Sequence, residues 1–490
     1  MKDLTNKSVL PPNEVIKLEV TPDSRPLAGA AWLATPINLD EFGYIEEEYI
    51  IGGDACVYSW PDSSKAPIIV REVGKYRTRI LVRKPKDPSK FSGFVAMESL
   101  NGSFVIEHQS AGWGLTQEQL IDSGDAWVGY AKDFQCLKIL EEFDPKRYSG
   151  LGFPNPKPES ERGKAGWDPL LEYYRIHNIE IALIIDSAYE RGLTYDAAFQ
   201  IGALLKSHSV DNPLFGYAVK EVIPFGINDY NTFIAALHPY LRLGNGDPVF
   251  DGYLMFMSGE GGALNFEEDM FHFEDERCLR TCDVPVIKIQ TAGDLLGIWP
   301  HPLWASLWRC EDSDDPGKQM RWYEIPGLGV MGAFRQDKSS FASEADYLKL
   351  GLGDRLKKIP HEKYWNQMCV HVTAGAYKNL KAWIKDGTPP PRAEKISLLG
   401  NYPDTAFELD QLGNHLGGIR HPYLEVPIAR FDDATNIEMF DISLRNQLYS
   451  DKSDYISKVR AHAEKLVKDR WILPPAVEML VTQAEMLEWS

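Results

Sequence analysis

Residues 218–241 read AVKEVIPFGINDYNTFIAALHPYL, an apolar run that passes directly into a segment with apolar residues at helical spacing. The first nine residues have the composition of a strand buried on both faces, and the last ten favour a helix. A buried strand followed at once by a helix is typical of a parallel sheet. Asn228 and Asp229 therefore belong to a strand-to-helix turn, a position that exposes side chains above a helix N-terminus.

Short apolar or alternating runs of the same kind recur along the chain. They predict strands over residues 44–58 (with a turn at Gly52-Gly53), 76–83, 93–100, 126–131, 251–257, 284–290 and 320–325. Residues 170–207 and 370–385 favour helices, and Gly387 with the prolines shortly after it ends the second. Buried strands that alternate with helices predict an α/β fold, with a mostly parallel sheet flanked by helices and large loop insertions.

The 490 residues are interpreted as one sheet core rather than three domains. An irregular N-terminal arm is expected over residues 1–40, the core with its insertions over 41–400, and an extension packed on the core over 401–490. No new sheet pattern appears after Ser397. From about Ser450 apolar residues share one helical face, which predicts a C-terminal helical extension.

The composition excludes several classes of function. Lys and Arg number 52 against 71 Asp and Glu, and the resulting net charge of −19 argues against nucleic acid binding. No apolar run reaches the roughly 20 residues of a membrane span, and no signal peptide is visible, so a cytoplasmic protein is expected. The six cysteines are not spaced for a metal site, so reduced thiols and no metal are expected.

Functional side chains are expected at the carboxyl ends of the strands, because ligands of open α/β sheets bind there. The loops that follow the predicted strands begin at Asn101, Lys132, Gly226, Ser258, Thr291 and Pro326. His371 at a helix start and His415 in a glycine-rich block do not follow predicted strands, so both are weaker candidates.

Several segments resemble a known family over nearly the whole length of the chain. They are residues 48–58, 76–85, 97–101, 386–390 and 413–420, together with the C-terminal helices. The block over residues 413–427 is the most specific. On these residues the chain resembles the alpha/beta hydrolase domain family, a divergent branch of the α/β-hydrolase superfamily. The resemblance implies an α/β-hydrolase-like fold and, in typical members, ester hydrolysis by a serine nucleophile.

The chain departs from that family where the serine chemistry is carried. Typical members have a Ser-Gln-Ser run after the elbow glycine, whereas this chain has Asn228, Asp229 and Tyr230. Val330 aligns with the catalytic histidine, while Asp294 fills the acidic position. An amide is no acyl-accepting nucleophile and valine takes no proton, so a serine acyl-enzyme is not expected. Asp229 is either a carboxylate nucleophile one residue late or a first-turn residue favoured by the helix dipole.

Five polar side chains in the same loops are further candidates. Asn101 is a candidate oxyanion donor, and His108 and His301 are candidates for replacing the lost base. Glu260 is a candidate general acid or base, and Tyr230 is a candidate hydrogen-bond donor to a substrate oxygen. Each of them also has a structural interpretation, as a turn, surface or packed residue.

Three functions remain open. The first is an enzyme that acts on a small hydrophobic molecule, without a cofactor, by acid–base or electrostatic catalysis of the lyase or isomerase type. The second is a non-catalytic pseudohydrolase that binds a ligand or partner, and the third is a carboxylic-ester hydrolase with an unrecognised nucleophile. The enzyme is favoured because Asn101, Gly226 and Asp294 are all present. The sequence sets no oligomeric state.

Overall fold

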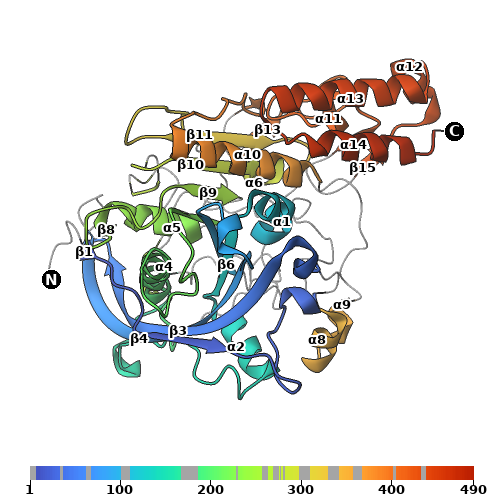
Figure 1. The fold of residues 1–490 in the computed structure, drawn as a ribbon. Coiled ribbons are helices and arrows are strands. Elements are labelled where there is room, and N and C mark those ends of the chain that lie inside the picture. The colour runs from blue at the N-terminus through green and yellow to red at the C-terminus, as the bar shows by residue number, and fades with distance from the viewer. Residues whose placement is uncertain are drawn as a thin grey trace.

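A computed structural model describes residues 7–33, 37–61, 68–100, 111–166, 186–227, 230–256, 263–268, 275, 277–279, 282–296, 309–328, 342–356, 367–400, 404–431 and 437–489. Within these residues the fold is built on a nine-stranded sheet (Figure 1). From one edge to the other its strands are β11 (Met320–Ile325), β10 (Val286–Thr291), β9 (Tyr253–Phe256), β7 (Glu221–Ile227), β5 (Phe94–Leu100), β6 (Ala126–Ala131), β4 (Ile69–Pro85), β3 (Tyr44–Ser59) and β2 (Glu14–Leu18).

The direction of the strands divides this sheet into two parts. Neighbouring strands from β11 to β6 pair in parallel. β4, β3 and β2 continue the sheet in antiparallel pairing. Every side chain of β5 and β6 is buried, as expected of strands covered on both faces. The predicted mostly parallel α/β sheet is confirmed, and the carboxyl ends of its parallel strands share one edge.

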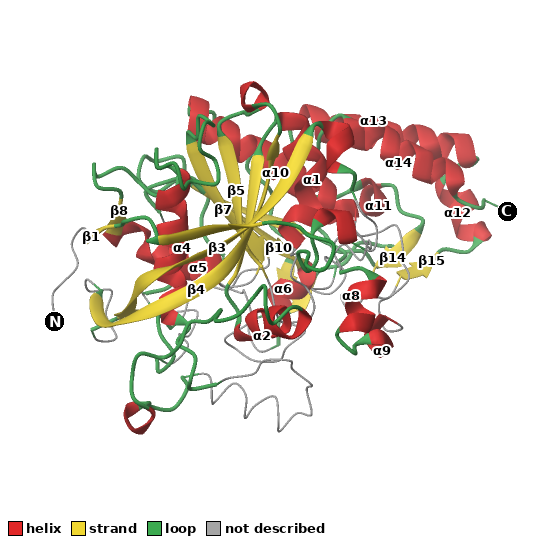
Figure 2. Cartoon of the chain, turned by 60° about the horizontal axis from the view of Figure 1, so that its bottom comes forward, coloured by secondary structure: helices red, strands yellow, loops and turns green. Residues whose placement is uncertain are grey.

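Helices cover both faces of the sheet. α1 (Ala111–Ser123) and α10 (Gln367–Asp386) pack on one face, and α4 (Gly192–Leu205) and α5 (Tyr230–Leu237) lie on the other (Figure 2). Alternate side chains of β5 enter the two hydrophobic cores, because successive residues of a strand point to opposite faces. This burial on both sides fixes the strand ends from which the candidate site loops start.

The C-terminal residues form the predicted helical extension packed on the core (Figure 1). Its two longest described helices, α13 (Lys452–Lys468) and α14 (Pro475–Met486), lie side by side. Tyr455 and other apolar side chains of α13 join the cluster that includes α10. The contact is close, because a Cβ on Gly375 of α10 would lie 2.2 Å from the carbonyl oxygen of Trp471.

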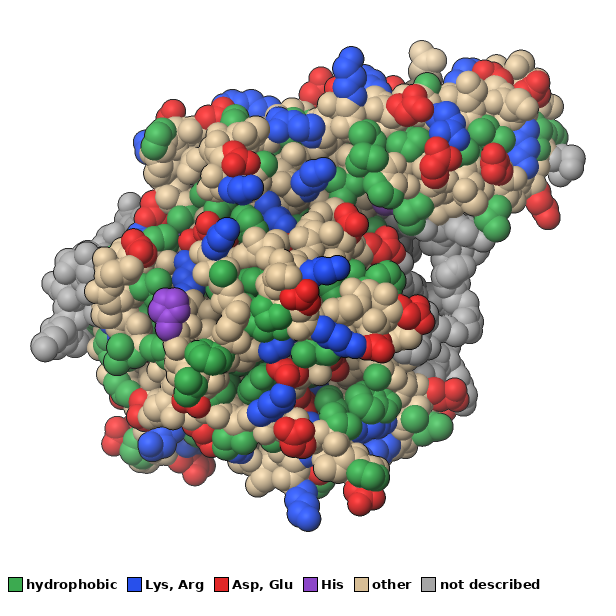
Figure 3. Space-filling view, in the orientation of Figure 1, with side chains coloured by type: hydrophobic (Ala, Val, Ile, Leu, Met, Phe, Trp, Pro, Cys, Tyr) green, Lys and Arg blue, Asp and Glu red, His purple; other side chains and the backbone are tan. Residues whose placement is uncertain are grey.

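The remaining described elements are short. They are β1 (Lys7–Ser8), β8 (Leu241–Arg242), β12 (Leu398–Leu399), β13 (Ala406–Phe407), β14 (Ala429–Phe431), β15 (Ile437–Met439), α2 (Phe134–Phe143), α6 (Ala292–Leu296), α8 (Glu344–Lys349), α9 (Gly353–Leu356), α11 (Pro422–Glu425) and α12 (Ile442–Leu448), with 3-10 turns η1 (Ala30–Trp32), η2 (Leu39–Phe42), η3 (Pro88–Lys90), η4 (Glu159–Glu161) and η5 (His238–Tyr240). Among the described residues, no helix combines the length and apolar composition that crossing a membrane requires. On the face drawn in Figure 3, acidic and basic side chains are interspersed.

The N-terminal part of the sheet differs from the sequence-based expectation. The arm over residues 1–40 is not wholly irregular, because β2 pairs with β3 at the edge of the sheet. The predicted turn at Gly52-Gly53 is wrong, since β3 continues through both glycines in register with β4. Gly52 instead allows close approach, because a Cβ there would lie 2.6 Å from a Glu14 carboxylate oxygen.

Two further expectations change. Of the helix predicted over residues 170–207, residues 170–185 lie outside the described ones, and residues 186–191 form a turn before α4 begins. The Asp186 carboxylate accepts the Ala188 N–H there at 2.8 Å, a local bond that competes with helix formation. After Ser397 two small two-stranded sheets, β12–β13 and β14–β15, lie outside the main sheet.

Candidate active site

The turn between β7 and α5 is the centre of the candidate site. β7 ends at Ile227 and α5 begins at Tyr230, so two residues connect the strand to the helix. A Cβ on Gly226 would lie 3.2 Å from Asn231 Nδ2 and 3.5 Å from Ser99 Oγ. Both of these side chains are buried, and Asn231 Nδ2 has no hydrogen-bond partner among the described residues. The end of β7 is therefore closely surrounded by polar atoms from β5 and α5.

Tyr230 connects α5 to the neighbouring helix. Its hydroxyl donates a hydrogen bond to the Thr194 carbonyl oxygen of α4 at 2.6 Å. Its ring lies 5.2 Å from the Tyr195 ring and 6.1 Å from the Tyr130 ring, measured between centroids. Burial raises the pKa of the Tyr230 hydroxyl. Donation to a substrate oxygen would require this hydroxyl to leave Thr194, so that role stays a prediction.

Asp294 lies in α6, directly after β10. Its Oδ2 accepts hydrogen bonds from the Thr291 N–H at 2.7 Å and from the Thr291 hydroxyl at 2.8 Å. The Gly293 N–H donates to the Leu328 carbonyl oxygen at 2.9 Å, which connects α6 to the loop that follows β11. A buried carboxylate next to that loop has the surroundings of the acidic member of a triad, and this role also stays a prediction.

The other predicted site residues lie outside the described part of the chain. They are Asn101, His108, Asn228, Asp229, Glu260 and His301, and Val330 is outside it as well. The roles assigned to them from the sequence remain predictions.

Two of the weaker histidine candidates lie in unexpected surroundings. The expectation that His415 is remote from a strand end is wrong, because its Nδ1 accepts the Gly327 N–H just beyond β11 at 3.0 Å. The residues around it fold back on the sheet, where the Ile419 N–H donates to the Glu324 carbonyl oxygen of β11. His371 of α10 instead meets the buried His421, with ring nitrogens 3.3 Å apart.

Lys132 is a cation at the end of β6, where the sequence indicated only the start of a loop. Its Nζ lies 4.7 Å from the centroid of the Tyr230 ring and 2.7 Å from Asp133 Oδ1. An ammonium over an aromatic face is favourable, and it brings positive charge next to the β7–α5 turn. A lysine directly after an entirely apolar strand is the sequence signal that identifies such a residue.

Glu98 of β5 is the second group that sequence reasoning missed. Its side chain is fully buried, and Oε1 accepts the Gly112 N–H at 2.8 Å. Oε2 accepts the Trp113 N–H at 2.8 Å and the Trp127 indole N–H at 2.7 Å. Burial raises the pKa of Glu98 to about 7, against the effect of these hydrogen bonds. The carboxyl group thereby holds the first turn of α1 against β5.

One group of possible metal ligands lies away from this edge. His238, Cys282 and Asp283 bring their ligand atoms within 4.8 Å of one another. His238 Nε2, however, lies 3.1 Å from Asp283 Oδ1 and 3.3 Å from an Arg242 guanidinium nitrogen. The positive charge of Arg242 occupies the side on which a cation would bind, and burial lowers the pKa of His238, so a structural histidine hydrogen-bonded to Asp283 fits these contacts better than a metal site.

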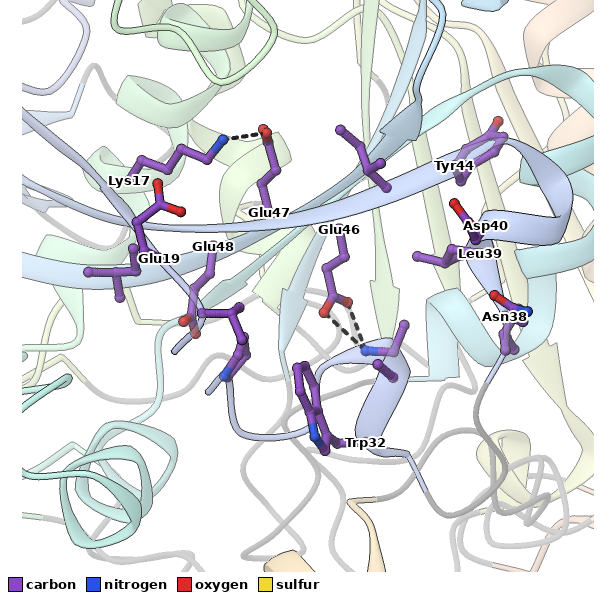
Figure 4. A pocket seen from close by; sticks show the side chains of 17 residues that line it. Lys17, Glu19, Trp32, Asn38, Leu39, Asp40, Tyr44, Glu46, Glu47 and Glu48 are labelled. Atoms are coloured by element: carbon purple, nitrogen blue, oxygen red, sulfur yellow. Dashed lines mark hydrogen bonds and ion pairs between the residues drawn. The ribbon is translucent and has the colours of Figure 1, made fainter. Parts of the chain in front are cut away.

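A cavity of about 720 Å³ lies over the antiparallel part of the sheet, beside β3 (Figure 4). Three successive glutamates of β3 line it, and each already has a cationic partner. Glu46 pairs with Arg83, Glu47 with Lys17 and Lys84, and Glu48 with Arg79 and Arg147. Because these charges are balanced and no lining residue belongs to a loop that follows a parallel strand, the cavity is no candidate for catalysis.

Comparison with known proteins gives one family and several distant structural neighbours. The family model described as alpha/beta hydrolase domain matches residues 11–482. Solved structures similar to the chain include a glucuronoyl esterase from Solibacter usitatus (10% identity, TM-score 0.31, 72% of this chain and 88% of that one). Another is a putative dienelactone hydrolase from Klebsiella pneumoniae (11% identity, TM-score 0.25, 64% of this chain and 99% of that one). A third is an S-formylglutathione hydrolase from Agrobacterium tumefaciens (12% identity, TM-score 0.27, 65% of this chain and 95% of that one). No curated protein matches the chain.

Proposed function

Because the chain belongs to the alpha/beta hydrolase domain family, we propose that it is an enzyme of that fold that acts on a small hydrophobic molecule without a serine acyl-enzyme. Its catalysis is acid–base or electrostatic, of the lyase or isomerase type. One observation carries the proposal: β7 ends at Ile227 and α5 begins at Tyr230, so the residues available at the nucleophile's turn are Asn228 and Asp229. Neither is a hydroxyl or thiol.

The proposed roles follow from the chemistry of each side chain. The Asn228 amide donates a hydrogen bond to an oxygen on which negative charge develops, and the Lys132 ammonium adds favourable charge nearby. Asp294 orients and balances the charge of a base, for which His301 is the candidate. Such a site moves protons and stabilises an oxyanion, as elimination, isomerisation and retro-aldol cleavage require.

A fluorophosphonate probe tests the proposal directly. We expect no stoichiometric labelling of the folded protein and no burst with p-nitrophenyl esters, because a serine activated by histidine is missing. Rapid labelling of one residue would overturn the proposal and support a carboxylic-ester hydrolase with an unrecognised nucleophile. Absence of both labelling and turnover across eliminations and isomerisations would support a pseudohydrolase.

Two variants sharpen the same test. Asn228→Ser combined with Val330→His restores both lost groups, and we expect it to gain fluorophosphonate labelling. Asn228→Ser alone is the matched control and should label far more slowly, because it lacks the base. If the double variant folds with an unchanged unfolding temperature and still does not react, residue 228 is not at the nucleophile position and the supporting observation is lost.

A further inference from the structure

A second cavity, of about 950 Å³, lies between β3, β4 and α2. Four aromatic side chains from separate parts of the chain line it: Tyr76, Phe134, Phe153 and Tyr189. We call it the aromatic cavity. Its volume is in the range of small-molecule sites, and aromatic linings are typical of them.

The aromatic wall is held in place by its own contacts. Tyr76 and Phe153 stack with centroids 5.6 Å apart and planes 5° apart. Tyr189 lies edge-on to Phe153 at 6.0 Å, and Phe134 lies 6.0 Å from Tyr189. The Tyr76 hydroxyl donates to Gln200 Oε1 at 3.0 Å. A wall that is ordered before a ligand arrives loses little conformational entropy on binding.

The aromatic cavity is lined by more basic than acidic side chains, and most of these charges are paired. Its lining holds Lys75, Arg77 and Lys138 against Glu14 and Glu141, in a chain whose net charge is −19. Glu14 is paired with Arg77 at 3.1 Å, and the Lys75 ammonium lies 3.6 Å from the Asp54 carboxylate just outside the lining. Lys138 has no hydrogen-bond or ion-pair partner among the described residues. The cavity of Figure 4, by contrast, has one lysine against five acidic residues.

The aromatic cavity is one side chain away from the candidate active site. The Tyr189 hydroxyl donates a hydrogen bond to the carbonyl oxygen of Lys132 at the end of β6. The ammonium of the same lysine lies over the ring of Tyr230, the first residue of α5. A molecule in the cavity that contacts Tyr189 therefore lies next to the parallel strand ends.

We propose that the aromatic cavity binds an organic anion with a planar ring body, of the aromatic carboxylate class. The half-buried rings of Phe134 and Tyr189 receive the ring of the ligand, and the Lys138 ammonium, unpaired among the described residues, receives the carboxylate. That this molecule is the substrate rests on the proposed function; that the cavity binds it does not.

Isothermal titration calorimetry with 2-naphthoate measures the binding, and the neutral 2-naphthylmethanol is the matched probe. We expect saturable binding of naphthoate at one site, and about 10-fold weaker binding of the alcohol, because it lacks the charge-assisted hydrogen bonds. Lys138→Gln should weaken naphthoate binding about 3-fold, as expected for a partly exposed ion pair. Lys468→Gln on α13 makes the same charge change at an exposed position away from the cavity and should have no effect.

A second variant fills the aromatic cavity without disturbing the fold. Gly152 lines it, and a Cβ there would have only Pro154 within 4 Å, at 3.9 Å. We expect Gly152→Phe to abolish naphthoate binding with an unchanged unfolding temperature, and Gly152→Ala to keep it. Unsaturable binding, equal affinity for the alcohol, or full binding by folded Gly152→Phe would each overturn the proposal. Naphthoate binding together with fluorophosphonate labelling of the turn would overturn only the proposed function.

Discussion

Replacing Glu98 by Gln tests whether burial or hydrogen bonding controls the charge of this carboxyl group. The side chain is fully buried, and burial raises its pKa to about 7 from the ordinary 4.5. Three N–H donors, from Gly112, Trp113 and the Trp127 indole, oppose that shift because they favour the carboxylate. Glutamine has the same shape and no titration, so it isolates the contribution of the charge.

The size of the effect follows from the two pKa values. Between pH 4.5 and pH 7 folded Glu98 keeps a proton that the unfolded chain has lost. The stability that it contributes is therefore fully present below pH 4.5 and is lost as the pH rises through 7. From pH 5.5 to pH 8 this loss amounts to about 2 kcal/mol. For 490 residues, with an unfolding entropy of about 1 kcal/mol per kelvin, that is about 2 °C in the unfolding midpoint.

Glu98→Gln should remove this part of the pH dependence. The variant has one acceptor oxygen for three donors, so at pH 5.5 we expect it to be less stable than wild type by about 1–3 kcal/mol. The difference in free energy of unfolding between wild type and variant, which we call the gap, should then decrease by about 2 kcal/mol from pH 5.5 to pH 8. Tryptophan fluorescence during urea or thermal unfolding measures it, and Glu118→Gln on the exposed side of α1 is the control. A gap that stays constant or widens with pH would refute the reasoning, because the three N–H donors would then outweigh burial.

Two other predictions concern stability. Gly417 has φ +75, and a Cβ there would lie 2.1 Å from the Lys395 carbonyl oxygen, so Gly417→Ala should lower the unfolding temperature by several degrees. The control is Gly216→Ala, with φ +85 and nothing within 4 Å of the added Cβ, which should cost only about 1 kcal/mol of backbone strain. Equal losses of stability in the two variants would contradict this reasoning. Burial lowers the pKa of His421 well below 6.5, so its contribution to stability is present at neutral pH and lost as the pH falls below 6.5. Hydrogen exchange in α13, corrected for its intrinsic pH dependence, should therefore be faster at pH 5.5 than at pH 7.5. Identical protection at the two pH values would show that folded His421 takes up a proton as readily as the unfolded chain does.

The parallel strands could be predicted from the sequence because strands buried on both faces consist of short runs of mostly apolar residues. β6 and β11 begin and end at the predicted residues. For β6 the reason is that an apolar run bounded by polar residues has few other ways to be buried. β2 was missed because it is an edge strand with exposed residues and so has no apolar run. The turn predicted at Gly52 is wrong because the need for glycine there comes from other strands: a Cβ would lie 2.6 Å from a Glu14 carboxylate oxygen and 2.9 Å from the Tyr76 carbonyl oxygen.

The candidate site depends on contacts that no local pattern contains. His415 reaches the end of β11 across about 90 residues of sequence, by way of a glycine-rich block that folds back on the sheet. Glu98 receives its donors from α1 and β6, and nothing in the spacing of those residues indicates a shared carboxylate. The order of the strands across the sheet decides which loops meet, and the sequence predicts the loops but not that order.

The stability of β7, the strand before Asn228, does not depend on the side chain at residue 228. β7 is paired between β5 and β9, and its core side chains, such as Val222 and Phe225, are fully buried. Burial of this kind supplies the stability of the strand, about 1.5–3 kcal/mol for each large apolar side chain, whatever occupies residue 228. The fold therefore does not require one particular side chain at residue 228. For the same reason membership of the family establishes the architecture of this chain, while the reaction has to be established from its own side chains at the strand ends.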